Sequence, residues 1–105
     1  MSARCAAFLL LSGLASPALS ETPAECAAFW SGVAAEQRAM PGLGVAPDEA
    51  LALVAEFAAL SETGVAEAHV AGYRLLYRGL IDGDSQSSDL FTRIATRCDA
   101  LLPRP

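Results

Sequence analysis

Apolar residues recur every three or four positions over most of the chain, a period that is typical of amphipathic helices. No stretch of the sequence alternates strictly between apolar and polar residues, so no strand is predicted. The repeat is clearest in the stretch before Pro41, where one face, with a polar interruption, carries Cys26, Phe29, Trp30, Val33, Gln37 and Met40. The pattern therefore predicts an all-α protein.

The first helix has clear boundary signals. Thr22 can cap its N-terminus, Pro23 suits the first helical position, and Glu25 completes a Ser/Thr-x-x-Glu capping box. Pro41 ends the helix in the run PGLGVAP. We therefore expect the fold itself to begin at Thr22.

Two further helices are predicted in the middle of the chain. One opens after Pro47, with acidic residues at the positive end of the helix dipole, and stops near Gly64, which can take the left-handed cap. The next runs over about 65–81. A single kinked helix over 47–81 also fits the pattern.

Two glycines interrupt the third of these helices. Gly72 and Gly79 lie seven residues apart, on one face. Each costs up to about 1 kcal/mol relative to alanine in a helix interior. We therefore expect this face to approach a neighbouring helix closely.

A fourth helix is predicted to begin around Ser87 or Ser88, with Asp89 in its first turn, and to end before Pro103. The connections between the four helices are short, which favours antiparallel neighbours. The predicted architecture is a small bundle of about four short antiparallel helices.

The first twenty residues have the pattern of a secretory signal peptide. Arg4 lies near the start, an apolar run follows over 5–15, and small residues precede the expected cut. The run is shorter than the roughly 20 residues that cross a bilayer. We therefore expect residues 1–20 to be cleaved and residues 21–105 to form one helical domain that does not insert into the membrane. Cleavage after Ala18 is the alternative, since Ser16 and Ala18 also suit the peptidase.

Two cysteines remain after this cleavage, Cys26 in the first predicted helix and Cys98 in the last. In an oxidising compartment an isolated pair is most simply a disulfide. In an up-down-up-down bundle the two positions lie at the same end of adjacent antiparallel helices. We therefore predict a Cys26–Cys98 bridge that ties the first helix to the last, with two free thiols or a bond to a partner as the alternatives.

The charge of the predicted mature chain excludes some partners. Six arginines and twelve acidic residues remain after cleavage, a formal charge of −6, and there is no lysine. Such a chain is a poor ligand for nucleic acid, whose binding depends on neutralising phosphates, and for anionic lipid surfaces. The preference for arginine and alanine indicates a GC-rich bacterial genome, so we expect a periplasmic or secreted bacterial protein.

Residues that could carry chemistry are few. His69 is the only histidine, and no serine lies in a Gly-x-Ser-x-Gly elbow, so nucleophilic catalysis has little support. Asp82 and Asp84 lack the spacing of a calcium-binding EF-hand loop, and a solvated turn that caps the last helix is expected there instead. The cysteines and the histidine are too far apart in sequence to indicate a metal site. The sequence therefore favours a protein that is not an enzyme and has no cofactor.

Tyrosines and arginines recur at four-residue spacing on the last two predicted helices. They are Tyr73, Tyr77, Arg74, Arg78, Arg93 and Arg97. Tyrosine and arginine are enriched at binding hot spots, so we interpret the set as a candidate surface for a protein partner. If the two arginine pairs face each other, they would make an anion or carboxylate site. The alternative is a set of surface ion pairs, with Asp82 and Asp89 four residues from Arg78 and Arg93, and tyrosines at the edge of the core.

We expect the function to be that of an exported, non-enzymatic accessory domain that binds another envelope protein. With two distant cysteines on helices, the overall plan loosely resembles the acid-stress chaperones of the periplasm. The alternative function is a holdase that exposes apolar surface in acid, where the twelve carboxylates are neutralised and the formal charge of −6 becomes about +6.

Overall fold

The computed structural model describes residues 21–103, and these residues form helices and no strand. The predicted signal peptide, residues 1–20, lies outside the described residues. Two short 3-10 turns separate the helices. The elements are α2 (Pro23–Ala39), η2 (Pro41–Leu43), α3 (Asp48–Leu60), η3 (Glu67–His69), α4 (Val70–Ile81) and α5 (Ser85–Asp99). The all-α prediction is confirmed.

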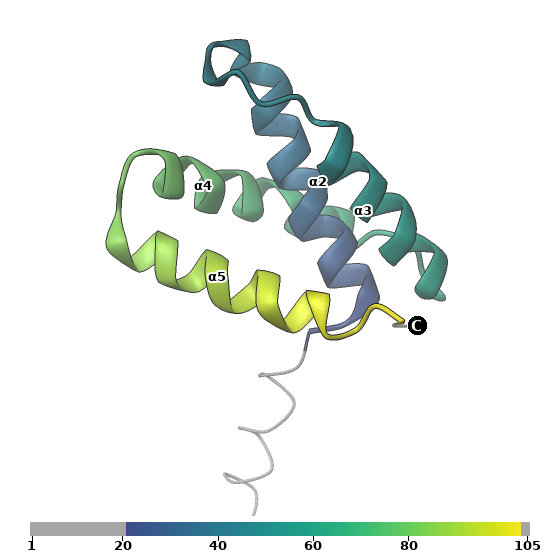
Figure 1. The fold of residues 1–105 in the computed structure, drawn as a ribbon. Helices are drawn as coiled ribbons and strands as arrows, with labels where there is room; N and C mark the ends of the chain where they lie inside the picture. The colour runs from purple at the N-terminus through teal and green to yellow at the C-terminus, as the bar shows by residue number, and fades with distance from the viewer. Residues whose placement is uncertain (1–20, 104–105) are drawn as a thin grey trace, which may run out of the picture.

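The four helices form two antiparallel hairpins that cross each other. One hairpin is α2 with α3 and the other is α4 with α5, and α4 passes behind α2 in Figure 1. Helix α2 is the centre of the fold because it packs extensively on both α3 and α4 and touches α5. Helix α3 packs on α2 alone among the four helices.

The helix boundaries follow local hydrogen bonding. The Thr22 side chain accepts a bond of 3.2 Å from the backbone N–H of Glu25, as predicted. Gly64 has φ of +79°, so the chain turns there and the alternative of one kinked helix over 47–81 is wrong. Helix α5 begins at Ser85, earlier than predicted, because Asp84 accepts a bond of 2.8 Å from the backbone N–H of Ser87.

One glycine sets the distance between the two hairpins. A Cβ atom added at Gly32 of α2 would lie 2.8 Å from Cβ of Tyr73 and 2.9 Å from the backbone nitrogen of Arg74. The prediction of close approach is right for Gly79, which meets the Ser87 side chain, and wrong for Gly72, which faces open space. The glycine that lets α2 and α4 cross closely is therefore Gly32.

The predicted disulfide is confirmed. Cys26 and Cys98 are joined with an S–S distance of 2.07 Å and a Cα–Cα distance of 5.7 Å, and both are fully buried beside Phe29 and Phe57. The bridge links the start of α2 to the end of α5. It joins two residues 72 positions apart, and closing this loop stabilises the fold by about 4 kcal/mol in the chain-entropy model. Disulfides are typical of proteins outside the reducing cytosol.

Within residues 21–103, no helix combines the length and the apolar character that a membrane span requires.

Candidate functional site

The tyrosine and arginine side chains of α4 lie along its crossing with α2. All four side chains that the sequence singled out on this helix, Tyr73, Arg74, Tyr77 and Arg78, form polar contacts with α2. Their partners are Glu25, Glu36 and Gln37. The structure therefore gives this set an intramolecular role, while its role in binding a partner stays a prediction.

Glu36 is at the centre of these contacts. Its side chain is 1% exposed, and both carboxylate oxygens are occupied. Nε of Arg74 donates to Oε2 at 2.6 Å, and Nε of Arg78 donates to Oε1 at 2.8 Å. The two arginine side chains are 39% and 55% exposed, so they reach solvent while they cover the acid. We call this group the Glu36 clamp.

The clamp keeps Glu36 charged. The hydrogen bond from Arg78, followed by that from Arg74, lowers the pKa of Glu36 against the opposing effect of burial. The same bond to Glu36 raises the pKa of Arg78. A buried carboxylate without its partners would be costly, so the clamp requires α4 to stay in register with α2.

A second acid on α2, Glu25, holds the start of α4. The Tyr73 hydroxyl donates to Oε1 of Glu25 at 2.7 Å, and Nδ1 of His69 lies 2.5 Å from Oε2. Burial, and then the bond to Glu25, raise the pKa of the Tyr73 hydroxyl, which therefore remains a donor. One carboxylate thus fixes the positions of a phenol ring and an imidazole ring.

Tyr77 lies deeper in the same crossing. It is 7% exposed, and its hydroxyl accepts a bond of 3.2 Å from Nε2 of Gln37. The amide oxygen of Gln37 is buried and has no partner in the described part of the chain. Tyr77 therefore belongs to the core itself, deeper than the edge position expected in the alternative interpretation.

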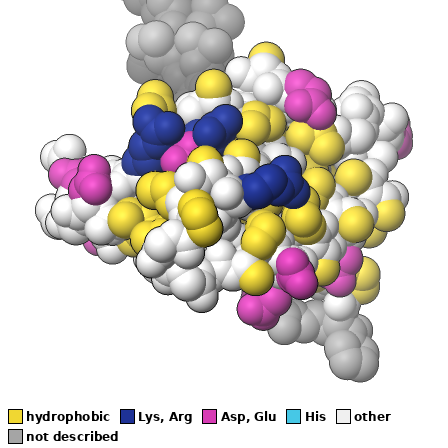
Figure 2. All heavy atoms as spheres, turned by 90° about the horizontal axis from the view of Figure 1, so that it is seen from above, with side chains coloured by type: hydrophobic (Ala, Val, Ile, Leu, Met, Phe, Trp, Pro, Cys, Tyr) yellow, Lys and Arg dark blue, Asp and Glu magenta, His cyan; other side chains and the backbone are white. Residues whose placement is uncertain are grey.

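The arginines of α5 are not part of the clamp. Arg97 pairs with Glu21 at 3.2 Å, whereas Arg93 is exposed. Among residues 21–103, neither Asp82 nor Asp89 makes the ion pair expected from its spacing. Figure 2 shows one face of the molecule, where basic side chains lie directly beside an acidic one amid scattered hydrophobic side chains.

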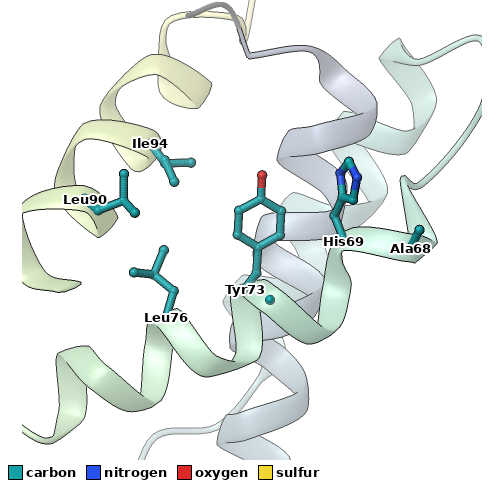
Figure 3. A pocket seen from close by; sticks show the side chains of 7 residues that line it. Ala68, His69, Tyr73, Leu76, Leu90 and Ile94 are labelled. Carbon is teal, nitrogen blue, oxygen red and sulfur yellow. The ribbon is translucent and has the colours of Figure 1, made fainter. Parts of the chain in front are cut away.

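An apolar pocket lies between α4 and α5, next to the pair formed by His69 and Glu25. Figure 3 shows Leu76 and Tyr73 of α4 facing Leu90 and Ile94 of α5 across it, with His69 at one end. The pocket has a volume of about 350 Å³, and Ala68 and Gly72 complete its lining. We call it the α4–α5 pocket.

The described residues contain no cluster of three or more side chains that could hold a metal ion. The histidine and the acids nearest the pocket are already engaged with each other. The site therefore offers an apolar surface with fixed polar groups at one end.

Comparison of the chain with protein-family models, with curated proteins and with solved structures finds no match.

Sequence reasoning gave Glu25 only a capping role and missed Gly32 and Glu36, although all three contact α4. A signal for them exists, because the three residues are seven and four positions apart and therefore share one face of α2. The hydrophobic pattern drew attention to the neighbouring face, which carries Phe29 and Val33. Two acids and a glycine on one face of a helix predict a polar contact with a neighbouring helix at short range.

Proposed function

We propose that this chain is a non-enzymatic protein-binding domain that receives an apolar segment of another exported protein in the α4–α5 pocket. The observation that carries the proposal is the pocket itself, which has walls of leucine and isoleucine and open access to solvent. The polar ends of Tyr73 and of the clamp arginines are already bonded within the domain. The surface that remains to recognise a partner is therefore mainly apolar.

Exposed leucines on the two helices that form this pocket support the proposal. Leu75 of α4 is 64% exposed, the highest value among the exposed large hydrophobic residues of the described chain, and Leu90 is 39% exposed. Burying such side chains contributes about 25 cal/mol per Å² of apolar area removed from water. A partner that covers both leucines gains this energy without breaking an existing contact of the domain.

The polar groups around the pocket define the partner further. Glu25 holds the Tyr73 and His69 rings in place, so part of the wall is organised before binding, which reduces the entropy lost on association. Arg93 follows Leu90 by three residues and is exposed on α5. The expected ligand is an apolar side chain with a carboxylate close to it.

Two leucines of equal exposure provide a matched test. Leu90 lines the pocket and is 39% exposed, while Leu51 lies on α3, away from the pocket, and is 40% exposed. We propose affinity capture from the envelope fraction of the producing cell with Leu90→Gln, Leu51→Gln and the wild type, after circular dichroism shows equal melting temperatures.

The proposal expects one defined partner to be recovered with the wild type and with Leu51→Gln, and to be lost with Leu90→Gln. Recovery of the same proteins with all three baits contradicts it. Loss with both variants at equal stability also contradicts it, because general surface hydrophobicity would then explain the capture.

A second candidate function, an acid-activated holdase, is favoured by the Glu36 clamp. Because the hydrogen bonds from Arg78 and Arg74 lower the pKa of Glu36 in the folded state, its carboxylate stays charged to a lower pH than that of an unfolded glutamate. Protonation then removes the charge that attracts Arg74 and Arg78, and the two hairpins lose their polar contact. The apolar surface between α2 and α4 would become accessible.

This second candidate predicts dye binding and suppression of client aggregation at pH 2 to 3. Glu36→Gln should reach the same state at a higher pH, because its side chain is neutral throughout. A protein that stays compact, does not bind the dye and is inactive at pH 2 to 3 excludes the holdase.

A further inference from the structure

A second hollow opens on the other side of α5, where α2 is left uncovered. Helices α3 and α5 both pack on α2, and side chains of both line a small hollow beside Trp30. A hollow of about 430 Å³ lies between α2 and α5, and a smaller one of about 40 Å³ beside it also reaches Leu53 and Phe57 of α3. The two hollows share Trp30, Ala95 and Asp99. We call this surface the Trp30 groove.

The groove has an aromatic floor. Trp30 is half-buried, and its ring packs edge-on against Phe29 at 4.9 Å and Phe91 at 6.1 Å between centroids. Leu53 of α3 and Ala95 of α5 form parts of the two walls. A tryptophan fixed in this way and still accessible is the kind of residue that dominates binding energy at protein interfaces.

Acidic residues border the groove on the α3 side. Glu49 and Glu56 lie four residues before and three residues after Leu53, so both flank this groove residue on the surface of α3, and both are exposed. Asp99 of α5 is a third acid and lines both hollows. Helix α3 contains no basic residue, and no arginine lines the groove. On the α5 wall the polar side chains include Thr92 and Thr96. The border therefore favours a cationic ligand.

We propose that the Trp30 groove binds a basic amphipathic helix of a partner protein. A groove between two helices on the surface of a third accepts a helix, with apolar residues directed to Trp30 and Phe91. Lysine or arginine on the flank of that helix then lies beside Glu49 and Glu56. A second copy of this chain is the wrong occupant, because its net charge is strongly negative and repels the same border.

This inference goes beyond the proposed function, since it concerns a different face and a ligand of opposite charge. Trp30 is the only tryptophan in the chain, so its fluorescence reports occupancy of the groove directly. The probe is a synthetic amphipathic helix of leucine and lysine, and the control is the same helix with glutamate in place of lysine. We expect a blue shift of Trp30 emission with the lysine peptide and none with the glutamate peptide.

Substitutions of Thr96 test where the peptide binds. Thr96 lines the groove and is exposed, and Ala71 is an exposed residue of α4 outside it. Thr96→Arg should weaken binding of the lysine peptide at least about tenfold relative to Ala71→Arg, which adds the same charge elsewhere. Thr96→Glu should strengthen binding, and this gain should shrink in high salt. All three variants are first checked for an unchanged circular dichroism spectrum.

Three outcomes overturn the proposal. One is equal affinity for the lysine and glutamate peptides. Another is equal affinity of Thr96→Arg and Ala71→Arg for the lysine peptide. The third is a blue shift that develops when the domain is concentrated without any peptide, which would assign the groove to self-association.

Discussion

Replacing Gly32 by alanine should separate the two helical hairpins. The added Cβ would lie 2.8 Å from Cβ of Tyr73, 2.9 Å from the nitrogen of Arg74 and 3.0 Å from the carbonyl carbon of Tyr73. Carbon atoms prefer about 3.5–4.0 Å, and two of these neighbours are backbone atoms that cannot rotate away. Helix α4 must therefore move by about 1 Å.

The magnitude follows from three contributions. Overpacking of a close contact costs about 1–3 kcal/mol. The same movement lengthens the bonds of Glu36, now 2.6 and 2.8 Å, toward the limit of hydrogen bonding. In the opposite direction, alanine stabilises a helix interior by about 1 kcal/mol relative to glycine. The expected net loss is about 2 kcal/mol, which for a domain of this size lowers the melting temperature by roughly 8–16 °C.

Gly72→Ala is the matched control. Gly72 also lies inside a helix, but a Cβ there meets nothing within 4 Å. The higher helix propensity of alanine is therefore the only contribution expected. We expect stabilisation of about 0.5–1 kcal/mol. Thermal melts followed by circular dichroism, with the disulfide intact, measure both variants. A Gly32→Ala protein that is as stable as Gly72→Ala would refute the close crossing of α2 and α4.

Further predictions concern charge, the disulfide and export. Because the pKa of Glu36 is lowered in the folded state, its carboxylate stabilises the fold above the pH at which an unfolded glutamate titrates. This stabilisation is lost as the pH falls toward the pKa of Glu36 in the folded state. In denaturant titrations, the free energy of unfolding of Glu36→Gln should therefore be about 1–3 kcal/mol lower than that of the wild type at pH 7. It should also fall less between pH 5 and pH 2. Parallel dependence of the two free energies on pH would contradict this. Reduction of the Cys26–Cys98 bond should lower the free energy of unfolding by about 4 kcal/mol. An unchanged midpoint of denaturant unfolding would show that the disulfide does not stabilise the fold. Mass spectrometry of the exported protein should place its N-terminus at Glu21, whereas a mass that includes residues 1–20 would overturn the signal-peptide prediction.

The hydrophobic pattern was sufficient to predict the helices and their order. A helix boundary was predictable where a cap acts locally, as at Thr22. Gly64 turns the chain but does not cap a helix, because α3 already ends at Leu60 with Ser61 as its C-cap. The turn at Asp84 caps α5, as expected, but the helix begins at Ser85 and not at Ser87 or Ser88, because Asp84 supplies the capping oxygen. The disulfide was predictable because two cysteines allow only one intramolecular pairing.

The crossing of the two hairpins was not predictable in the same way. Four-residue spacing shows that Tyr73 and Tyr77 share a face of α4, as do Arg74 and Arg78, but it does not show what that face meets. Glu36 forms both arginine bonds from 38 and 42 residues away, a separation that no local pattern records. Periodicity defines the faces of a helix, whereas long-range packing decides which face is buried.

Photo-crosslinking from position 75 tests the proposed binding surface most directly. A photoreactive phenylalanine analogue in place of Leu75, which is 64% exposed, extends from α4 without disturbing the core. The same analogue at Leu51 of α3 is the control. Irradiation in the producing cell should attach one defined envelope protein at position 75 and not at position 51. No adduct at position 75, or the same adducts at both positions, would contradict binding through the face formed by α4 and α5.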